Sequence, residues 1–191
     1  PDVWATLGAI TASTTRLHMS ISVYVLPLRN PFEVARATGT LDILSGGRLA
    51  LGAGTGWMKD EYDLYGVDFA TRGARMDEML EILRGFWSEG TVEYHGKHFD
   101  IPRVQISPAP MRNLPVWIGG AAPVALRRAA RCDGWIGAGN TPQEVPALLA
   151  QIRGYRADLG KSMDGFETVI GLTTPFDPAQ LASLEEHGMS S

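Results

Sequence analysis

The sequence is poor in cysteine, in long apolar runs and in clusters of basic residues, and each shortage excludes a class of protein. Cys132 is the only cysteine among 191 residues, so no disulfide can form within the chain. The longest apolar run, at 21–28, has the length of a strand and falls short of the roughly 20 residues that a membrane helix needs. We therefore expect a protein of the reducing cytoplasm that does not enter a membrane.

Charge and histidine content exclude two further kinds of site. The net charge is −4 and the isoelectric point is near 5.5, which argues against a nucleic-acid partner. The four histidines are scattered and the single cysteine has no second thiol, so no zinc-site spacing is present and no metal is expected. Hydrophobic residues make up 45% and charged residues 20%, which is typical of a globular domain.

What is present is a regular alternation of strand-like and helix-like segments. Strands are expected at 17–26, 48–54, 114–118, 135–138 and 166–172. Helices are expected at 2–14, 31–45, from about 71 to 87, from 123 onward, from a capping box at 141–144 to 159, and at 177–187. The segment 91–106 turns at 95–97, which predicts a hairpin insertion at about 90–112.

This order indicates an α/β fold with a parallel sheet, because parallel strands need crossover connections. The five strands fit either an open doubly wound sheet or five-eighths of a (β/α)8 barrel, and periodicity does not separate the two. No linker, repeat or low-complexity segment divides the chain, so a single domain is expected over 1–191.

Two glycine-bearing turns follow predicted strands. Gly52-Ala53-Gly54-Thr55-Gly56 has the spacing G-x-G-x-G, which differs from the G-x-G-x-x-G of dinucleotide-binding folds. Gly119-Gly120-Ala121-Ala122 precedes the helix expected from Pro123, where free backbone N–H groups can bind an anion. On spacing alone, either segment can also be a tight turn without a ligand.

Five segments taken together resemble one protein family. They are Leu26-Pro27-Leu28-Arg29-Asn30-Pro31, Leu41-Asp42-Ile43-Leu44-Ser45-Gly46-Gly47-Arg48, Leu51-Gly52-Ala53-Gly54-Thr55-Gly56-Trp57, Arg72-Gly73-Ala74-Arg75-Met76-Asp77-Glu78 and Pro115-Val116-Trp117-Ile118-Gly119-Gly120. From Asp2 to about Gly171 this succession closely resembles the bacterial-luciferase-like monooxygenase superfamily, especially its deazaflavin-dependent oxidoreductases. The resemblance implies a (β/α)8 TIM barrel with its site at the C-terminal ends of the strands. Residues 1–191 would then form one barrel domain that holds roughly strands 3 to 7 and is incomplete at both ends.

The resemblance also implies where the ring of a cofactor lies. Ser22 and Val23 match a bulge with a non-proline cis peptide that lies against one face of an isoalloxazine or deazaflavin ring. Thr55 and Gly56 match the edge of a turn beside the ring or its ribityl chain, where glycine allows a close approach.

Further site residues follow from the same resemblance. The turn formed by Gly119, Gly120, Ala121 and Ala122 matches the one that holds the cofactor phosphate. Trp57 follows the cofactor turn and is expected to border the substrate pocket. Some members carry a Glu at that position, and others place an acid/base residue on a strand before the position of Asp2. The sequence therefore identifies no catalytic residue.

The implied activity is hydride transfer between 8-hydroxy-5-deazaflavin (coenzyme F-420) and a small organic substrate. An FMN-dependent luciferase-like monooxygenase is the first alternative, and a non-catalytic cofactor-binding barrel is the second. A third, an open-sheet nucleotide-binding protein, does not depend on the resemblance. Luciferase-like proteins are often dimers, so a homodimer is expected.

The remaining polar features are interpreted as structural. Asp42 and Arg48 are expected to be partners near a helix end, and the charged residues at 72, 75, 78 and 81 have the spacing of surface ion pairs. His95 is expected to be an exposed polar residue beside the hairpin turn, and Cys132 to be buried packing.

Overall fold

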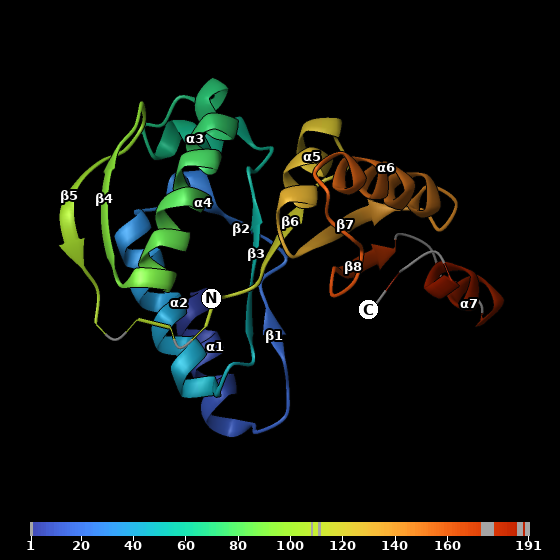
Figure 1. Cartoon of the computed structure of the whole chain (residues 1–191), viewed down its shortest axis with the longest axis horizontal. Coiled ribbons are helices and arrows are strands. Elements are labelled where there is room, and N and C mark those ends of the chain that lie inside the picture. The colour runs from blue at the N-terminus through green and yellow to red at the C-terminus, as the bar shows by residue number, and fades with distance from the viewer. Residues whose placement is uncertain (1, 108, 111, 173–177, 187–188, 190–191) are drawn as a thin grey trace. The chain divides into compact units, whose positions relative to one another are not determined.

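The computed structural model describes residues 2–107, 109–110, 112–172, 178–186 and 189. The chain folds into two compact units, Pro1–Leu114 and Pro115–Ser191 (Figure 1). Each unit contains parallel strands that alternate with helices, as the sequence predicts. The single domain expected over 1–191 stays a prediction.

The first unit combines parallel strands, helices and a hairpin. Its strands are β1 (Met19–Ser20), β2 (Tyr24–Val25), β3 (Leu49–Gly54), β4 (Thr91–His95) and β5 (Asp100–Gln105). Its helices are α1 (Val3–Ser13), η1 (Leu26–Leu28), α2 (Pro31–Ser45), α3 (Lys59–Leu64), η2 (Phe69–Thr71) and α4 (Arg72–Glu89). α2 packs against β3, α4 packs against α2, and β4 lies beside α4 (Figure 1).

Helix α2 begins and ends where its capping residues place it. The Asn30 side chain accepts hydrogen bonds from the N–H groups of Phe32 and Glu33, and Pro31 occupies the first turn. Gly46 ends the helix in the left-handed conformation, with φ of 67°. Both ends agree with the prediction.

The strand predicted at 17–26 is interrupted. β1 and β2 pair separately with β3, with Ser20 opposite Ala50 and Tyr24 opposite Ala53. The chain therefore advances four residues from 20 to 24 while β3 advances three from 50 to 53, which leaves one extra residue as a bulge. The prediction of a continuous strand is wrong, because side-chain composition does not reveal an extra residue in the ladder. The bulge that the resemblance implies at this position is present.

The polar stretch at 59–70, for which the sequence pattern predicts no element, contains α3 and η2. Tyr62 is fully buried, and Phe69 meets its ring edge-on with centroids 5.2 Å apart. On the exposed side, Lys59 pairs with Asp63 one turn later at 2.6 Å. One anchoring aromatic residue among charges produces no helical periodicity, so this helix was not predictable from the pattern.

Helix α4 buries the apolar stripe predicted for it. Five residues of the stripe are at most 5% exposed: Met76, Met79, Leu80, Leu83 and Trp87. The surface ion pairs expected among the charged residues of α4 are not the contacts observed. Arg72 and Arg75 instead stack on the rings of Phe69 and Phe99, with the guanidinium carbons 3.9 and 4.7 Å from the ring centroids.

The predicted hairpin forms and is attached to α4 by one carboxylate. β4 and β5 pair antiparallel, with His95 opposite Asp100. The Glu78 carboxylate of α4 accepts hydrogen bonds of 2.9–3.2 Å from the three successive backbone N–H groups of 97–99. Glu78 therefore caps the hairpin turn rather than pairing along its own helix.

Asp42 has a different partner from the one expected. It is 2% exposed and pairs with Arg112 at 3.0 Å, whereas Arg48 donates to backbone oxygens at the end of α1. Arg112 also donates to the carbonyl groups of Gly47 and Leu49. Burial raises the pKa of the Asp42 carboxyl group, and the Arg112 charge opposes this rise. The expected Asp42–Arg48 pair is wrong because the true partner is 70 residues away in the chain.

The second unit is a parallel sheet with helices. Its strands are β6 (Val116–Gly119), β7 (Gly134–Asn140) and β8 (Glu167–Leu172), with β7 paired to both others. Its helices are α5 (Pro123–Arg131), α6 (Val145–Asp158) and α7 (Pro178–Glu186). α5 and α6 pack against each other. The expected ends of the last helix, 177 and 187, lie outside the described residues.

Helix α6 begins later than the capping box at 141–144 predicts. The Glu144 carboxylate accepts the backbone N–H of Thr141 at 2.8 Å, but no side chain caps the first turn of the helix. The hydrogen bonds from Thr141 lower the pKa of Glu144. The motif therefore closes a separate turn, and the helix starts at Val145.

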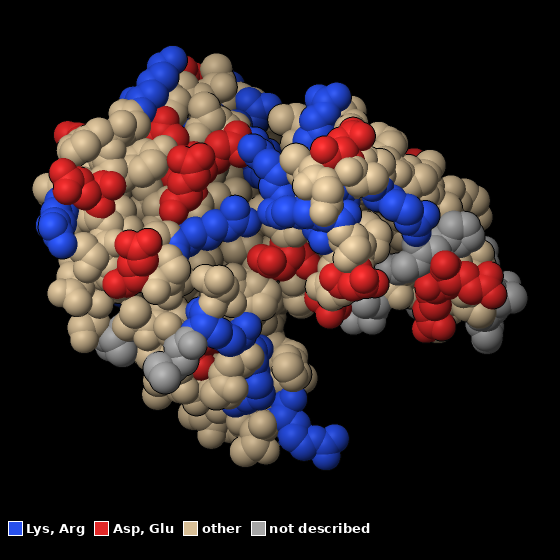
Figure 2. All heavy atoms as spheres, viewed as in Figure 1, with Lys and Arg blue, Asp and Glu red and all other residues tan. Residues whose placement is uncertain are grey.

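The surface mixes charges of both signs. Lys/Arg and Asp/Glu side chains are interspersed over the face drawn in Figure 2. His95 is exposed and bonded to Asp100 at 2.6 Å, and Cys132 is buried, as expected. In the described part of the chain, no helix is both long enough and apolar enough to cross a bilayer.

Candidate functional site

In the first unit, the bulge between β1 and β2 lies directly against β3. The Ser22–Val23 peptide bond is cis, as the resemblance implies. Val23 covers Gly54 so closely that a Cβ atom at Gly54 would lie 2.5 Å from the Val23 Cγ2 atom. Val23 therefore fills the space that a side chain at 54 would need, and Gly54 is buried against the bulge.

The turn after β3 is held from two sides. Gly56 has φ of 69°, and a Cβ atom there would lie 2.9 Å from the Val25 Cγ1 atom, so β2 closes one side. On the other side the hydroxyl group of Tyr62 donates a hydrogen bond to the Thr55 carbonyl. Burial raises the pKa of Tyr62 to about 12, so this hydroxyl stays protonated near neutral pH.

Trp57, the next residue, stands out from the surface. It is 83% exposed, and Leu64 of α3 is exposed to the same extent. Nearby, Tyr65 stacks on the Arg29 guanidinium and accepts its hydrogen bond at 2.8 Å. An exposed indole beside the turn is compatible with a substrate contact, but its place in a substrate pocket stays a prediction.

In the second unit, the turn at 119–122 joins β6 to α5. Gly120 has φ of 116°, and its N–H donates to the Ile136 carbonyl at 3.2 Å. The indole N–H of Trp135, a fully buried residue of β7, donates to the Gly120 carbonyl at 2.8 Å. No side chain caps α5, whose first helical residue is Pro123. Pro123 has no N–H group and the Ala125 N–H donates to the Ala122 carbonyl at 2.8 Å, so only part of the first turn of α5 offers N–H groups, the type of donor that binds phosphate.

The structure brings four predicted residues together within the first unit: Ser22, Val23, Thr55 and Gly56. None of their side chains can exchange a proton near neutral pH. This arrangement can bind and orient a flat ring, and acid–base chemistry would need another group. The predicted contacts of these residues, and of Gly119, Gly120, Ala121 and Ala122, with a cofactor stay predictions.

Sequence reasoning missed the two aromatic donors that hold these turns. Tyr62 lies seven residues after Thr55 in a charged stretch, and Trp135 resembles an ordinary core residue of a strand. The one sequence feature that could have pointed to them is the residue type, since Tyr and Trp need a hydrogen-bond partner when they are buried. Their partner is not encoded locally, so only the structure identifies it.

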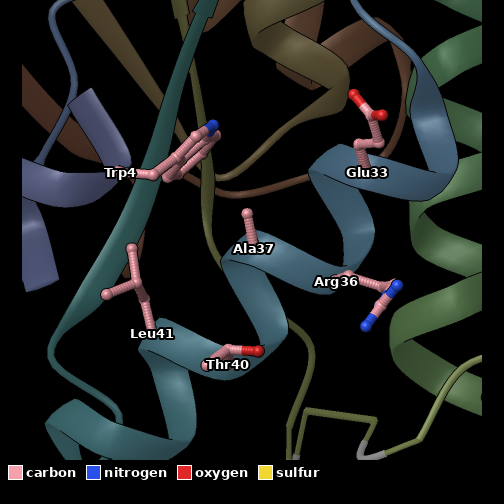
Figure 3. Close-up of a pocket in the computed structure, with 6 residues that line it drawn as sticks. All are labelled: Trp4, Glu33, Arg36, Ala37, Thr40 and Leu41. Carbon is pink, nitrogen blue, oxygen red and sulfur yellow. The ribbon is translucent and has the colours of Figure 1, made fainter. Parts of the chain in front are cut away.

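Two surface pockets of the first unit lie away from the predicted residues. One, of about 420 Å³, lies between α1 and α2, where Trp4 faces Ala37 and Leu41, with Glu33, Arg36 and Thr40 also lining it (Figure 3). The other, of about 370 Å³, lies between the start of α2 and β5. In the described residues, no group of three His, Cys, Asp or Glu side chains is placed to hold a metal ion.

Comparison with known proteins gives a family model and many relatives. The model described as luciferase-like monooxygenase matches residues 1–187. An uncharacterized protein of Mycobacterium tuberculosis (strain ATCC 25618 / H37Rv) is 44% identical over 180 residues, which cover 90% of this chain and 62% of that protein. An F420-dependent glucose-6-phosphate dehydrogenase of Segniliparus rotundus is 30% identical over 186 residues, or 93% of this chain and 55% of that protein. The chain thus spans little more than half the length of these relatives.

Solved structures share the fold at lower identity. An F420-dependent secondary alcohol dehydrogenase, in complex with an F420-acetone adduct, has a TM-score of 0.81 at 21% identity, covering 89% of this chain and 53% of that chain. The oxygenating constituent of 3,6-diketocamphane monooxygenase from Pseudomonas putida, in complex with FMN, has a TM-score of 0.77 at 16% identity, covering 88% of this chain and 52% of that chain. These likenesses assign the chain the α/β fold of the luciferase-like TIM barrels, of which it covers about half.

Proposed function

We propose a function that starts from the family of the protein: this chain belongs to the luciferase-like monooxygenase family. The family includes F420-dependent and FMN-dependent oxidoreductases. Within it, this protein transfers a hydride between the 8-hydroxy-5-deazaflavin coenzyme and a small organic substrate. Because the chain spans only part of its relatives, the activity of the whole protein is part of the proposal.

The observation that carries the proposal is the meeting of the bulge with the glycine turn after β3. Val23 packs on Gly54 and Val25 packs on Gly56, which fixes the bulge against the turn. Ser22 is exposed and Val23, Thr55 and Gly56 are partly exposed, so a planar group can reach them. Ser22 and Val23 of the bulge and Thr55 and Gly56 of the turn would hold the ring. When bound, the deazaflavin supplies a ring carbon that accepts or donates the hydride.

The second unit contributes an anion-binding turn to the proposal. Gly119, Gly120, Ala121 and Ala122 would form the turn that holds the coenzyme phosphate, aided by the dipole of α5. The Gly120 N–H is bonded to the Ile136 carbonyl, so the donors would be the other backbone N–H groups of the turn. Trp135 keeps the Gly120 carbonyl engaged, so this carbonyl is not free to turn toward an anion. Trp57, exposed after the ring-binding turn, would border the substrate.

FMN is the alternative cofactor, because an FMN-bound monooxygenase shares this fold. The two cofactors are separated by titrating the purified protein with each and following the fluorescence of the ligand. We expect saturable binding of the deazaflavin coenzyme and at least tenfold weaker binding of FMN. Tight binding of FMN without deazaflavin binding would overturn the choice of cofactor, and binding of neither would overturn the function itself.

A non-catalytic cofactor-binding protein predicts a different second result. Candidate alcohols are added to the protein with the oxidised coenzyme bound and candidate aldehydes to the protein with the reduced coenzyme bound, and the visible absorption of the deazaflavin is followed. The proposed enzyme changes the redox state of the coenzyme with at least one substrate. Unchanged absorption across the whole panel would favour the non-catalytic alternative.

A further inference from the structure

We propose that Tyr62 is a positioning residue, whose hydroxyl group orients the Thr55–Gly56 peptide for contact with the cofactor ring. This role rests on the proposed function. It concerns a residue of α3 that lies outside the glycine turn and that neither the motif nor the spacing of the turn identifies.

The packing around Tyr62 holds its side chain in place independently of the hydrogen bond to the turn. Its side chain is 0% exposed, and Phe69 meets its ring edge-on at an interplanar angle of 83°. Its own carbonyl accepts the N–H of Val67 at 3.0 Å, which closes the chain around it. The hydroxyl group therefore reaches the Thr55 carbonyl from a rigid base, and its pKa of about 12 keeps it a donor at working pH.

The hydrogen bond determines where the next N–H group points. In a trans peptide the C=O and N–H bonds point in opposite directions, so fixing the Thr55 carbonyl also fixes the Gly56 N–H, pointing away from Tyr62. Val25 closes one side of Gly56. Within the described part of the chain, the Gly56 N–H has no backbone or side-chain acceptor. This N–H is thus held in one direction and left available to an acceptor on a ligand.

The substitution Tyr62→Phe removes the hydroxyl group and keeps the packed ring. The probes are the deazaflavin coenzyme and its phosphate-free riboside, titrated by fluorescence. One lost hydrogen bond that orders the turn predicts roughly five- to tenfold weaker binding of both probes. An effect through the phosphate turn would instead weaken the coenzyme alone, and that result would overturn the assigned role.

Tyr94→Phe is a matched control. Tyr94 also donates its hydroxyl to one acceptor, Glu81, at 3.0 Å, and also has a pKa raised to about 12, but it lies in the hairpin. We expect its affinity for both probes to stay within twofold of wild type. Equal losses in the two variants would mean a general effect of losing a tyrosine hydroxyl, and would reject the specific role of Tyr62.

The outcomes separate a failure of the proposed function from a failure of the Tyr62 role. If wild-type protein binds neither probe, the proposed function fails and the Tyr62 role fails with it. If wild-type and Tyr62→Phe proteins bind equally, only the role fails. Should Tyr62→Phe not fold, as judged by circular dichroism, the backbone amide signal of Gly56 is followed in wild-type protein by NMR. The signal must move when the riboside is added, and a stationary signal would overturn the inference.

Discussion

At the scale of single residues, neighbouring valines leave space only for glycine at two positions at the end of β3. Val23 occupies the space that a side chain at Gly54 would need, and Val25 does the same at Gly56. Valine is stiff about its first side-chain torsion, so neither can easily move aside. The motif G-x-G-x-G at this position therefore reflects close packing of neighbouring strands as well as a tight turn.

Gly54→Ala tests this packing. The added Cβ atom would overlap Val23, and we expect a loss of about 1–3 kcal/mol in the free energy of unfolding, measured with urea. Gly8→Ala is the control, because Gly8 lies in α1 with open space around it and should stabilise the protein by roughly 0.5–1 kcal/mol. Equal effects of the two substitutions would contradict the packing argument.

A second residue-scale prediction concerns His95. The carboxylates of Asp100 first and Glu93 second raise its pKa above the usual value. The folded pKa exceeds the unfolded one, so its contribution to stability is complete below the unfolded pKa, near 6.5, and is lost as the pH rises through the folded pKa. NMR titration should give a raised pKa that returns toward the usual value in Asp100→Asn. An unchanged titration in that variant would show that Asp100 is not the cause.

At the scale of elements, the sequence predicts best where local chemistry decides. Asn30 and Gly46 bound α2 as expected, since a capping side chain and a left-handed glycine act on their immediate neighbours. The bulge near Ser22 and the helix around Tyr62 were not predictable from local pattern, because each depends on a partner element. The bulge was expected only through family resemblance.

The hairpin gives the element-scale prediction. Glu78 accepts three successive backbone N–H groups of the turn at 97–99, and an amide in its place has only one acceptor oxygen. Glu78→Gln should cost about 1–3 kcal/mol of unfolding free energy and speed hydrogen exchange at those amides. Glu81→Gln, which affects one hydrogen bond to Tyr94, should leave the amides at 97–99 protected. Slow exchange in both variants would show that Glu78 does not hold the turn.

At the scale of the whole molecule, contacts between residues far apart in the sequence determine the hydrogen-bond partners that the sequence does not predict. The α/β class followed from alternation, and the family fold followed from five linked segments. The hydrogen-bond partners of Asp42, Thr55 and Gly120 could not be predicted from the sequence. Each partner lies on another segment, and residue spacing does not show which segments pack together. Homodimer formation stays a prediction, to be measured by sedimentation.

The Asp42–Arg112 pair is the prediction at this scale, because it joins α2 to the segment that follows the hairpin. Arg112→Met would leave a buried carboxylate without its cation. The Arg112 side chain is 36% exposed, so water screens the pair in part and we expect a loss of about 1–3 kcal/mol of unfolding free energy. The double variant Asp42→Asn with Arg112→Met should regain part of that loss, since no buried charge remains. A double variant as unstable as the sum of its singles would rule out coupling between them.

The bond between the Trp135 indole and the Gly120 carbonyl also has a practical consequence. The emission of an indole responds to the hydrogen bond at its nitrogen. Trp135 is therefore a fluorophore bonded to the backbone of the turn that is proposed to bind phosphate. Replacing the other four tryptophans with phenylalanine would leave Trp135 as the single tryptophan, and its emission can then be followed while phosphate is added.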